Sequence, residues 1–156
     1  MRLYRLVKTR FAKDAFTGEG ALKYGGRWNS KGHLGVYLGE TVALCQLETL
    51  VHLNDADELK SFTLFTLDVP DEQIQVLESG SLPDNWNDEV APAILQEIGD
   101  NWLQQAQALV LLIRSVLSPI EHNALFNPAH PLAATVLANG LQGQPFQMDA
   151  RLFKMK

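Results

Sequence analysis

The chain has 156 residues with a single cysteine, is 46% apolar, and carries a formal net charge of −5 at pH 7. This size and composition suit one globular domain over residues 1–156, and a lone cysteine excludes an internal disulfide. The longest apolar run, Ala108–Ile113, falls short of the roughly 18 residues of a membrane span, and the basic N-terminus lacks the apolar stretch of a signal peptide, so we expect a cytoplasmic protein.

The first third of the chain predicts two strands, a glycine-rich loop and one helix. A strand is expected at Arg2–Val7, at the edge or entry of a sheet, and a loop with five glycines follows over Ala12–Gly32. Gly35–Leu38 is typical of a short strand. Thr41–Leu53 predicts a helix, because Thr41 suits an N-cap and leucines follow at helical spacing.

The rest of the chain predicts further strands and a second main helix. The helix is expected over Asp88–Gln107, with Pro92 near its first turn, where proline is tolerated. Strands are expected at Phe62–Val69, Ile74–Leu77, Ala108–Ile113, Thr135–Ala138 and Pro145–Met148. Strands and helices do not alternate regularly, which favours an α+β fold with a mainly antiparallel sheet over a Rossmann fold. Neither GxGxxG nor a P-loop motif is present in the sequence.

The charges are divided unevenly along the chain. Residues 1–53 hold eight Lys/Arg and four Asp/Glu, whereas residues 54–156 hold five and fourteen. The basic part suits an anionic small ligand such as a phosphate-bearing metabolite. The acidic part argues against direct binding of nucleic acid and suits a basic partner protein. The alternative is that these charges are simply solvated faces.

The sequence GGRWN at Gly25–Asn29 is the first candidate for ligand binding. Paired glycines let a ligand approach the backbone closely, and the guanidinium of Arg27 can bind a phosphate or carboxylate through two hydrogen bonds. Trp28 would add an aromatic wall. The alternative is a plain turn with a surface arginine and a packed tryptophan.

Glu48 and Tyr37 are the next candidates. Glu48 lies beside the apolar stripe of the predicted helix, where a carboxylate costs free energy unless it is paired or used, and His52 one turn later could pair with it. Tyr37 could stack on a ring and form a hydrogen bond. The alternatives are a helix-edge glutamate that reaches water and a core tyrosine.

Two polar segments follow the long apolar strand. Arg114 and Ser115 stand where this strand turns polar, either because it delivers them to a cleft or because it reaches the surface. The run Glu121–Pro131 contains Asn123 and Asn127, whose amides can bind backbone or ligand, so a structural loop and a binding loop both stay open. The four histidines are scattered without a metal-binding spacing, and we expect no metal.

Taken in order, these segments resemble the RES domain family, which is named for an arginine, a glutamate and a serine. The resemblance spans nearly the whole chain and rests on LYRLVK (3–8), GGRWNSKG (25–32), VYLGETVALCQLETLVHL (36–53), LIRSVLSPIEHNALFNPAHP (112–131) and, more weakly, FQMDARL (146–152). The family often has proline before its serine, where this chain has Arg114. Ser115 still matches better than Ser118, because it keeps a family-like distance to Asn123.

The resemblance implies an ADP-ribosyltransferase-like α+β fold with a mainly antiparallel, split sheet and flanking helices. It also implies the toxin of a bacterial toxin–antitoxin module, whose antitoxin is a helix-turn-helix protein of the Xre class, and it leaves open a homodimer within that complex. Family members act on NAD⁺, either by degrading it through hydrolysis or phosphorolysis or by passing ADP-ribose to a protein. NAD⁺ is then a consumed substrate and not a recycled cofactor.

This chemistry suggests a role for each candidate. Glu48 would hold the ribose and stabilise the positive charge that develops as nicotinamide leaves, and Arg27 would bind the pyrophosphate. Tyr37 would stack on the nicotinamide or pack its ribose, and Ser115 would hydrogen-bond a ribose or the nicotinamide amide. Two asparagines would help to shape the pocket: Asn123 and Asn127.

We therefore expect a toxin that cleaves NAD⁺ at the nicotinamide–ribose bond and arrests growth. The nearest alternative is a mono-ADP-ribosyltransferase that modifies a specific cellular protein with the same Arg27, Tyr37 and Glu48. An alternative from another class is a non-catalytic nucleotide-binding or interaction module, which would bind its ligand without turnover.

Overall fold

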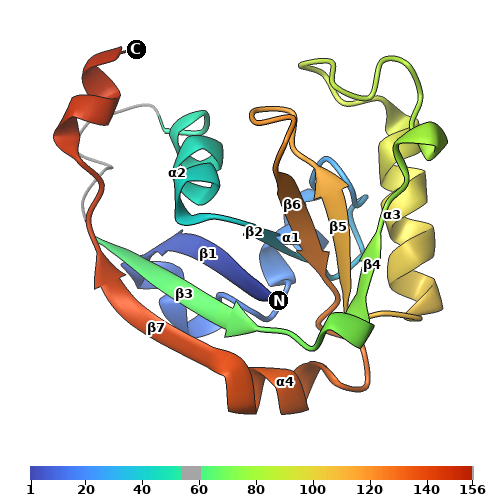
Figure 1. Cartoon of the computed structure of the whole chain (residues 1–156), viewed down its shortest axis with the longest axis horizontal. Coiled ribbons are helices and arrows are strands. Elements are labelled where there is room, and N and C mark those ends of the chain that lie inside the picture. The colour runs from blue at the N-terminus through green and yellow to red at the C-terminus, as the bar shows by residue number, and fades with distance from the viewer. Residues whose placement is uncertain (54–60, 156) are drawn as a thin grey trace.

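The computed structural model describes residues 1–53 and 61–155, which form a seven-stranded sheet with flanking helices (Figure 1). The strands are β1 (Arg2–Lys8), β2 (Val36–Gly39), β3 (Phe62–Asp68), β4 (Ile74–Val76), β5 (Val110–Arg114), β6 (His122–Phe126) and β7 (Leu141–Phe146). The helices are α1 (Glu19–Tyr24), α2 (Val42–Leu50), α3 (Ala93–Gln105) and α4 (Ala133–Gly140). Short 3₁₀ turns lie at Thr9–Asp14, Asp71–Gln73, Ser79–Ser81 and Ala150–Met155.

The sheet is split in its middle. Its strand order is β4-β5-β6-β2-β1-β3-β7, and of these neighbours β4 and β5 are parallel while the others are antiparallel. β1 pairs with β3 along its whole length but with β2 at one position, where Tyr4 faces Gly39. The two halves therefore diverge after this contact, and the predicted α+β fold with a split, mainly antiparallel sheet is confirmed.

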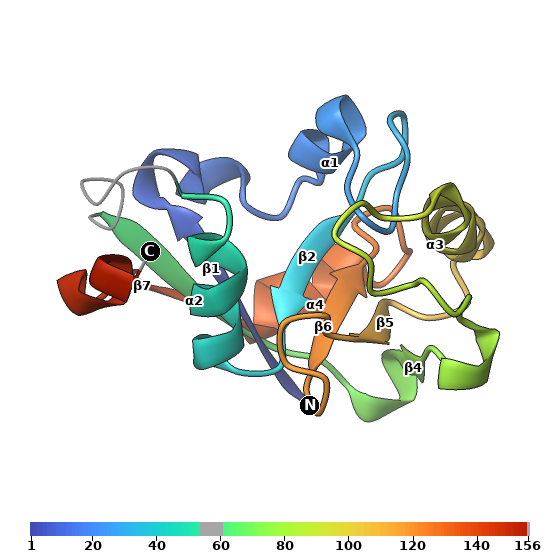
Figure 2. The same cartoon turned by 90° about the horizontal axis from the view of Figure 1, so that it is seen from above.

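Helices α2, α3 and α4 pack against the sheet (Figures 1 and 2). The apolar face of α3 buries Leu95 and Trp102 against Leu111 of β5 and Leu125 of β6. On the other half, α2 lies next to β1, and α4 contacts β3. Fully burying one leucine stabilises a fold by about 1.5–3 kcal/mol, so these contacts fix the position of each helix on the sheet.

The predicted elements are mostly confirmed, with ends shifted by a few residues. Strands lie at the places expected for β1 to β5, and the first two residues of Pro145–Met148 end β7. The long apolar run is buried on both faces as β5, from Val110 to Ile113. Thr41 is the N-cap of α2, because its Oγ1 accepts the Leu44 N–H at 3.1 Å.

Two predictions about strands are wrong. Of the two positions expected for the first strand, the edge or the entry of the sheet, the edge is wrong, since β1 lies between β2 and β3 with Leu3 fully buried. Thr135–Ala138 is not a strand but part of α4, where flanking alanines favour a helix over the β-branched pair that suggested a strand.

Helix α3 begins at Ala93 and not at Asp88. A proline disfavours helical geometry in the residue before it, and Pro92 itself is the N-cap.

One strand was not predicted at all. β6, with the sequence HNALF, begins with two polar residues and precedes an Asn-Pro turn, so its sequence is typical of a loop. It nevertheless pairs with β2 on one side and β5 on the other, and Ala124, Leu125 and Phe126 are fully buried. Tertiary pairing therefore decides the structure here, and it places Asn123 beside the split in the sheet.

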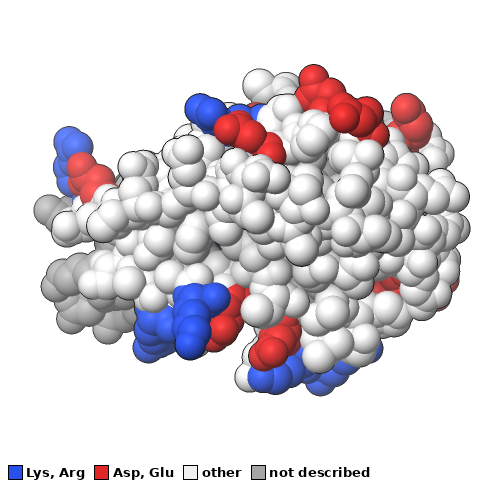
Figure 3. All heavy atoms as spheres, turned by 90° about the horizontal axis from the view of Figure 1, so that it is seen from below, with Lys and Arg blue, Asp and Glu red and all other residues white. Residues whose placement is uncertain are grey.

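Within residues 1–53 and 61–155, no helix combines the length and the apolar character that crossing a bilayer requires. Figure 3 shows one face of the molecule, on which Lys and Arg lie close to Asp and Glu at the margins of a broad uncharged area. The described part of this face has no continuous basic stripe. On this face, the uneven charge along the sequence does not produce a single charged surface.

Candidate active site

A cleft of about 1280 Å³ lies where the two halves of the sheet diverge. Small-molecule pockets commonly measure about 300–1,000 Å³, so this cleft has room for a dinucleotide. Its lining includes five of the predicted site residues: Arg27, Trp28, Tyr37, Glu48 and Asn123. Arg27 and Glu48, which are 21 positions apart in sequence, thus face one shared cleft from different elements.

Glu48 is held in place by two side chains from outside its own helix. Its Oε1 accepts a hydrogen bond from Asn123 Nδ2 at 2.6 Å and one from Ser115 Oγ at 3.3 Å. The expected pairing with His52 does not form, although His52 borders the same cleft. Because both bonds end on Oε1, the other carboxylate oxygen, Oε2, keeps its capacity to accept hydrogen bonds from a ligand.

The start of α2 is tied to the start of β6, which fixes the position of this carboxylate. Thr41 Oγ1 donates to Glu121 Oε1 at 2.6 Å while it caps α2. Glu40 Oε2 accepts the backbone N–H of His122 at 2.7 Å. The helix that carries Glu48 and the strand that carries its partner Asn123 are therefore joined at their first residues.

Ser115 has a different position from the one expected. It is fully buried, and its Oγ accepts the backbone N–H groups of Leu117 and Ser118 at 3.1 and 3.2 Å. Its own proton is therefore directed to Glu48. Ser115 therefore lies behind Glu48 as seen from the cleft, and its contact with a ribose or amide stays a prediction.

Arg27 lies in the segment Gly25–His33, here called the Arg27 loop. Its guanidinium donates to three backbone carbonyls, those of Trp86 at 3.0 Å, Asp88 at 2.7 Å and Glu89 at 3.3 Å. Carbonyl oxygens orient a guanidinium but do not neutralise its charge. Arg27 is thus a fixed cation on the border of the cleft.

Tyr37 supports the Arg27 loop through its hydroxyl. This hydroxyl donates to Asn29 Oδ1 at 2.7 Å and accepts the N–H of Trp28 at 3.0 Å, and burial raises the pKa of Tyr37 well above its usual range. A Cβ on Gly26 would lie 2.5 Å from the same oxygen, which explains why this position is occupied by a glycine. The ring of Tyr37 borders the cleft while its hydroxyl is occupied.

Two further predicted residues serve the core. Trp28 borders the cleft but is only 4% exposed and packs with Leu95 of α3, so it does not form the open aromatic wall that was expected. Asn127 is 1% exposed, and its Nδ2 donates to the carbonyl of Leu103 at 2.9 Å. Asn127 therefore stabilises the turn after β6 and does not border the cleft.

Arg5 is a candidate that the sequence reasoning missed. It borders the cleft from β1, and its Nη1 donates to the carbonyl of Tyr37 at 2.5 Å. Its Nε is buried without a hydrogen-bond partner, and no carboxylate in the described part of the chain pairs with it. Burial lowers the pKa of Arg5 to about 10, so it is still a cation at neutral pH. The alternation of β1 could have revealed it, because Arg5 shares a face with the buried Leu3.

The split sheet and its cleft, bordered by a supported carboxylate and two arginines, define an α+β domain of ADP-ribosyltransferase-like fold. The RES domain family profile matches residues 2–149, and the chain therefore belongs to the RES domain family. This confirms the resemblance that the sequence motifs indicated.

Relatives and a solved structure agree with this assignment. "Toxin Res" of Yersinia enterocolitica is 43% identical over 97% of this chain and 99% of its own length. "Prs ADP-ribosylating toxin" of Sphingobium sp. is 39% identical over 82% of this chain and 81% of its own length. A chain of the M. tuberculosis MbcT–MbcA toxin–antitoxin complex has a similar fold, with a TM-score of 0.72 at 20% identity, covering 99% of this chain and 87% of that one. The broader prediction, a toxin with a RES domain, is confirmed.

Proposed function

We propose that this chain is a toxin that cleaves NAD⁺ at the bond between nicotinamide and ribose. The observation that carries the proposal is the position of Glu48, whose carboxylate is held by Asn123 and Ser115 on a cleft that Arg5 and Arg27 also border. NAD⁺ offers the matching chemistry, namely a ribose next to a cationic leaving group and a pyrophosphate with negative charge. NAD⁺ is consumed as a substrate in this proposal.

The reaction needs stabilisation of a cation more than a strong acid. When the bond breaks, nicotinamide takes the electron pair and leaves as a neutral base, and the ribose becomes an oxocarbenium-like cation. Glu48 stabilises this cation and binds the ribose hydroxyls through Oε2. Water then adds to the ribose carbon and releases a proton, which gives ADP-ribose, whereas phosphate in place of water gives ADP-ribose 1″-phosphate. A positioned electrostatic group of this kind contributes about 10²–10³ in rate.

The two arginines suit the pyrophosphate. Neither Arg5 nor Arg27 is neutralised by a carboxylate among the described residues, so both keep a full charge for an anion. An arginine binds phosphate through two parallel hydrogen bonds, which fixes orientation as well as charge. Arg5 lies on β1 and Arg27 on its loop, so the phosphates would be bound from two sides of the split.

The test is product analysis after purified protein is mixed with NAD⁺, with and without phosphate. We expect free nicotinamide together with ADP-ribose or its 1″-phosphate. Glu48→Gln should remove most of this activity, while Glu97→Gln, an equal loss of charge on the exposed side of α3, should retain it. Intact NAD⁺ in the wild-type reaction would contradict the proposal, and binding without turnover would favour the non-catalytic module.

Transfer of ADP-ribose to a protein is the second candidate. It is favoured by one observation, the name of the Sphingobium relative as an ADP-ribosylating toxin at 39% identity. The same arginines and Glu48 would serve, because the acceptor alone differs. Label that moves from NAD⁺ to a protein band in a cell extract would favour transfer, and free ADP-ribose in the same extract would favour degradation.

We also propose that an antitoxin protein restrains this toxin. The support is the similar fold of a chain in the MbcT–MbcA toxin–antitoxin complex, and the family resemblance favours an antitoxin of the Xre helix-turn-helix class. Co-expression with the product of a neighbouring helix-turn-helix gene should restore growth. Light scattering of the purified complex would give its stoichiometry and show whether two toxin copies are present.

A further inference from the structure

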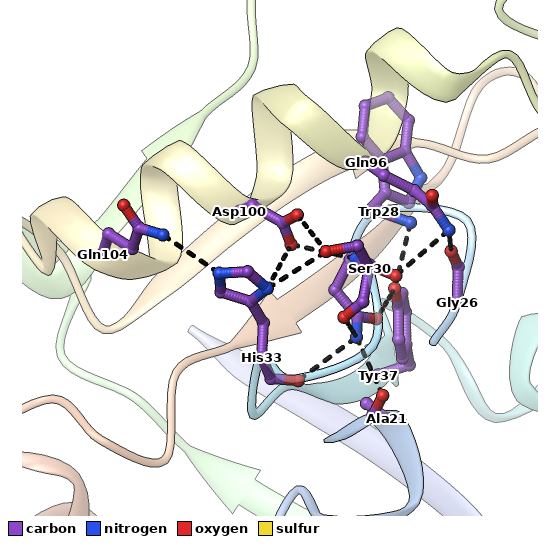
Figure 4. A network of polar contacts seen from close by, with 10 residues as sticks. Ala21, Gly26, Trp28, Ser30, His33, Tyr37, Gln96, Asp100 and Gln104 are labelled. Carbon is purple, nitrogen blue, oxygen red and sulfur yellow. Dashed lines mark hydrogen bonds and ion pairs between the residues drawn. The ribbon is translucent and has the colours of Figure 1, made fainter. Parts of the chain in front are cut away.

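One face of α3 lies against the Arg27 loop and carries polar side chains one turn apart (Figure 4): Gln96, Asp100 and Gln104. Gln96 Nε2 donates to the carbonyl of Gly26 at 2.9 Å. Gln104 Nε2 lies 3.0 Å from Nε2 of His33. The helix therefore contacts the Arg27 loop near both ends of the loop.

Asp100 makes the central contact of this face. Its Oδ1 accepts the backbone N–H of Ser30 at 2.9 Å, and its Oδ2 accepts the hydroxyl proton of Ser30 at 2.5 Å. His33 Nδ1 lies 3.3 Å from Oδ1, and the Asp100 side chain is 15% exposed. Short hydrogen bonds to a carboxylate are the strong ones, so one side chain fixes the backbone and the hydroxyl of Ser30 together.

The serine, histidine and aspartate do not form a catalytic triad. In a triad the serine and the carboxylate bind opposite nitrogens of the imidazole, and the serine gives its proton to the ring. Here Ser30 and Asp100 both lie on the Nδ1 side of His33, and the serine proton points to Asp100. Gln104 donates to Nε2, which places the ring proton on Nδ1. The network is built to hold the loop and not to activate Ser30.

The backbone of the helix and the backbone of the Arg27 loop are also in close contact. A Cβ added to Gly99 would lie 1.7 Å from the carbonyl oxygen of Trp28, so α3 lies directly on the loop backbone. Arg27 stands between two of the anchored points, with Gln96 holding Gly26 before it and Asp100 holding Ser30 after it. The backbone position from which the Arg27 side chain starts therefore depends on α3, while the guanidinium is oriented by carbonyls of the segment before that helix.

We propose that Asp100 is a positioning residue for substrate binding, because it fixes the Arg27 loop so that Arg27 meets the anionic part of the substrate. This inference rests on the proposed function and goes further, since it assigns a role to a residue outside the cleft lining. Arg27 binds phosphates before and during bond cleavage, and such binding affects KM more than kcat. Asp100 should share this signature.

The experiment measures kcat and KM for NAD⁺, the dissociation constant of ADP-ribose and the melting temperature of four proteins. These are the wild type, Asp100→Asn, Ser30→Ala and the matched control Glu97→Gln, which removes the same charge from the exposed side of α3. Asp100→Asn should raise KM and the dissociation constant about tenfold, with kcat within about threefold, as expected for loss of ground-state binding. Glu97→Gln should change neither constant.

A double-mutant cycle with Arg27→Ala separates positioning from general stability. If Asp100 acts through Arg27, the double variant should have the same KM as Arg27→Ala alone. Two effects that multiply would overturn the proposal, as would an unchanged KM in Asp100→Asn. If Asp100→Asn does not fold, Ser30→Ala decides the question, because it removes the 2.5 Å bond to Asp100 and the 3.1 Å contact with His33 Nδ1 but leaves the backbone bond to Asp100. A raised KM supports the proposal and an unchanged KM rejects it.

The design keeps this proposal distinct from the proposed function. A wild-type chain that binds ADP-ribose without cleaving NAD⁺ would contradict the proposed function, while the binding constants would still decide the role of Asp100. A chain that neither binds nor cleaves would reject both. Active wild-type protein with an Asp100→Asn variant of equal KM would reject the inference alone.

Discussion

The two walls of the cleft hold their charges in different ways. The acidic wall is built from regular elements, with Glu48 on α2 and its partner Asn123 on β6. The basic wall is a loop held by a helix and a tyrosine, and it presents Arg27. The first arrangement fixes one oxygen of a carboxylate and suits the reacting ribose, whereas the second suits the binding of a larger anion. Loss of the acidic wall should therefore lower kcat, and loss of the basic wall should raise KM.

The largest effect is expected from Glu48→Gln. Glutamine keeps the shape and can still accept from Asn123, but it removes the charge that stabilises the oxocarbenium-like ribose. We expect kcat for NAD⁺ cleavage to fall by about 10²–10³ with little change in KM. A rise in KM with an unchanged kcat would show instead that the acidic wall binds the substrate and does not catalyse the reaction. Glu97→Gln is the matched control.

Arg5→Met should give the next largest effect, and it tests the second arginine of the cleft, which lies on β1 across the split from the Arg27 loop. We expect KM for NAD⁺ to rise by about 10–100-fold, because an unneutralised guanidinium is lost from the cleft. Stability should hold or increase, since the buried Nε without a partner carries a desolvation cost that methionine does not. Thermal unfolding beside steady-state kinetics checks both parts. A large fall in melting temperature with unchanged KM would make Arg5 a structural residue.

Arg27→Lys should have a smaller effect, since it keeps the charge. A lysine cannot donate to the carbonyls of Trp86 and Asp88 in the same planar arrangement and still bind phosphate through two bonds. We expect KM to rise about tenfold with kcat nearly unchanged. A variant with wild-type KM would show that charge alone is sufficient on this wall.

The same comparison explains what the sequence could and could not predict. The helix of the acidic wall was predictable, because Thr41 suits an N-cap and leucines follow at helical spacing. Of the expected apolar stripe, however, Leu44 is buried whereas Leu47 and Val51 are exposed. β6 was not, since its polar start and following Asn-Pro turn favour a loop, and its pairing with β2 and β5 depends on strands distant in sequence. Arg5 was missed although alternation places it on the same face as the buried Leu3, because its position on the cleft depends on where β1 and β2 diverge.

The roles of side chains behind the walls were also beyond the sequence. Ser115 was predicted to match the serine of the family, but its hydrogen bond to Glu48 appears only once β5 and α2 are packed together. Trp28 illustrates the reverse case. Its position beside Arg27 suggested a ligand contact, but its side chain packs against α3 in the core. Spacing identifies which residues gather near a site, while packing decides which of them remain open to a ligand.

The smallest effect on chemistry is expected from Ser115→Ala, and it tests how the acidic wall is held. The variant removes the weaker of the two bonds to Glu48 Oε1, at 3.3 Å, and leaves the 2.6 Å bond from Asn123. We expect kcat to fall about three- to tenfold, well short of Glu48→Gln, and stability to fall by about 0.5–1.5 kcal/mol because the part-buried N–H groups of Leu117 and Ser118 lose their acceptor.

Asn123→Ala is the comparison that interprets this result. It removes the shorter bond, so it should lower kcat more than Ser115→Ala does, and the double variant should approach the activity of Glu48→Gln because the carboxylate then has no side-chain partner left among those described. Kinetics of the three variants at equal folded fraction would measure this order. If Ser115→Ala alone abolished turnover, the serine would have to contact the substrate itself, and the acidic wall would contain two reacting groups in place of one supported acid.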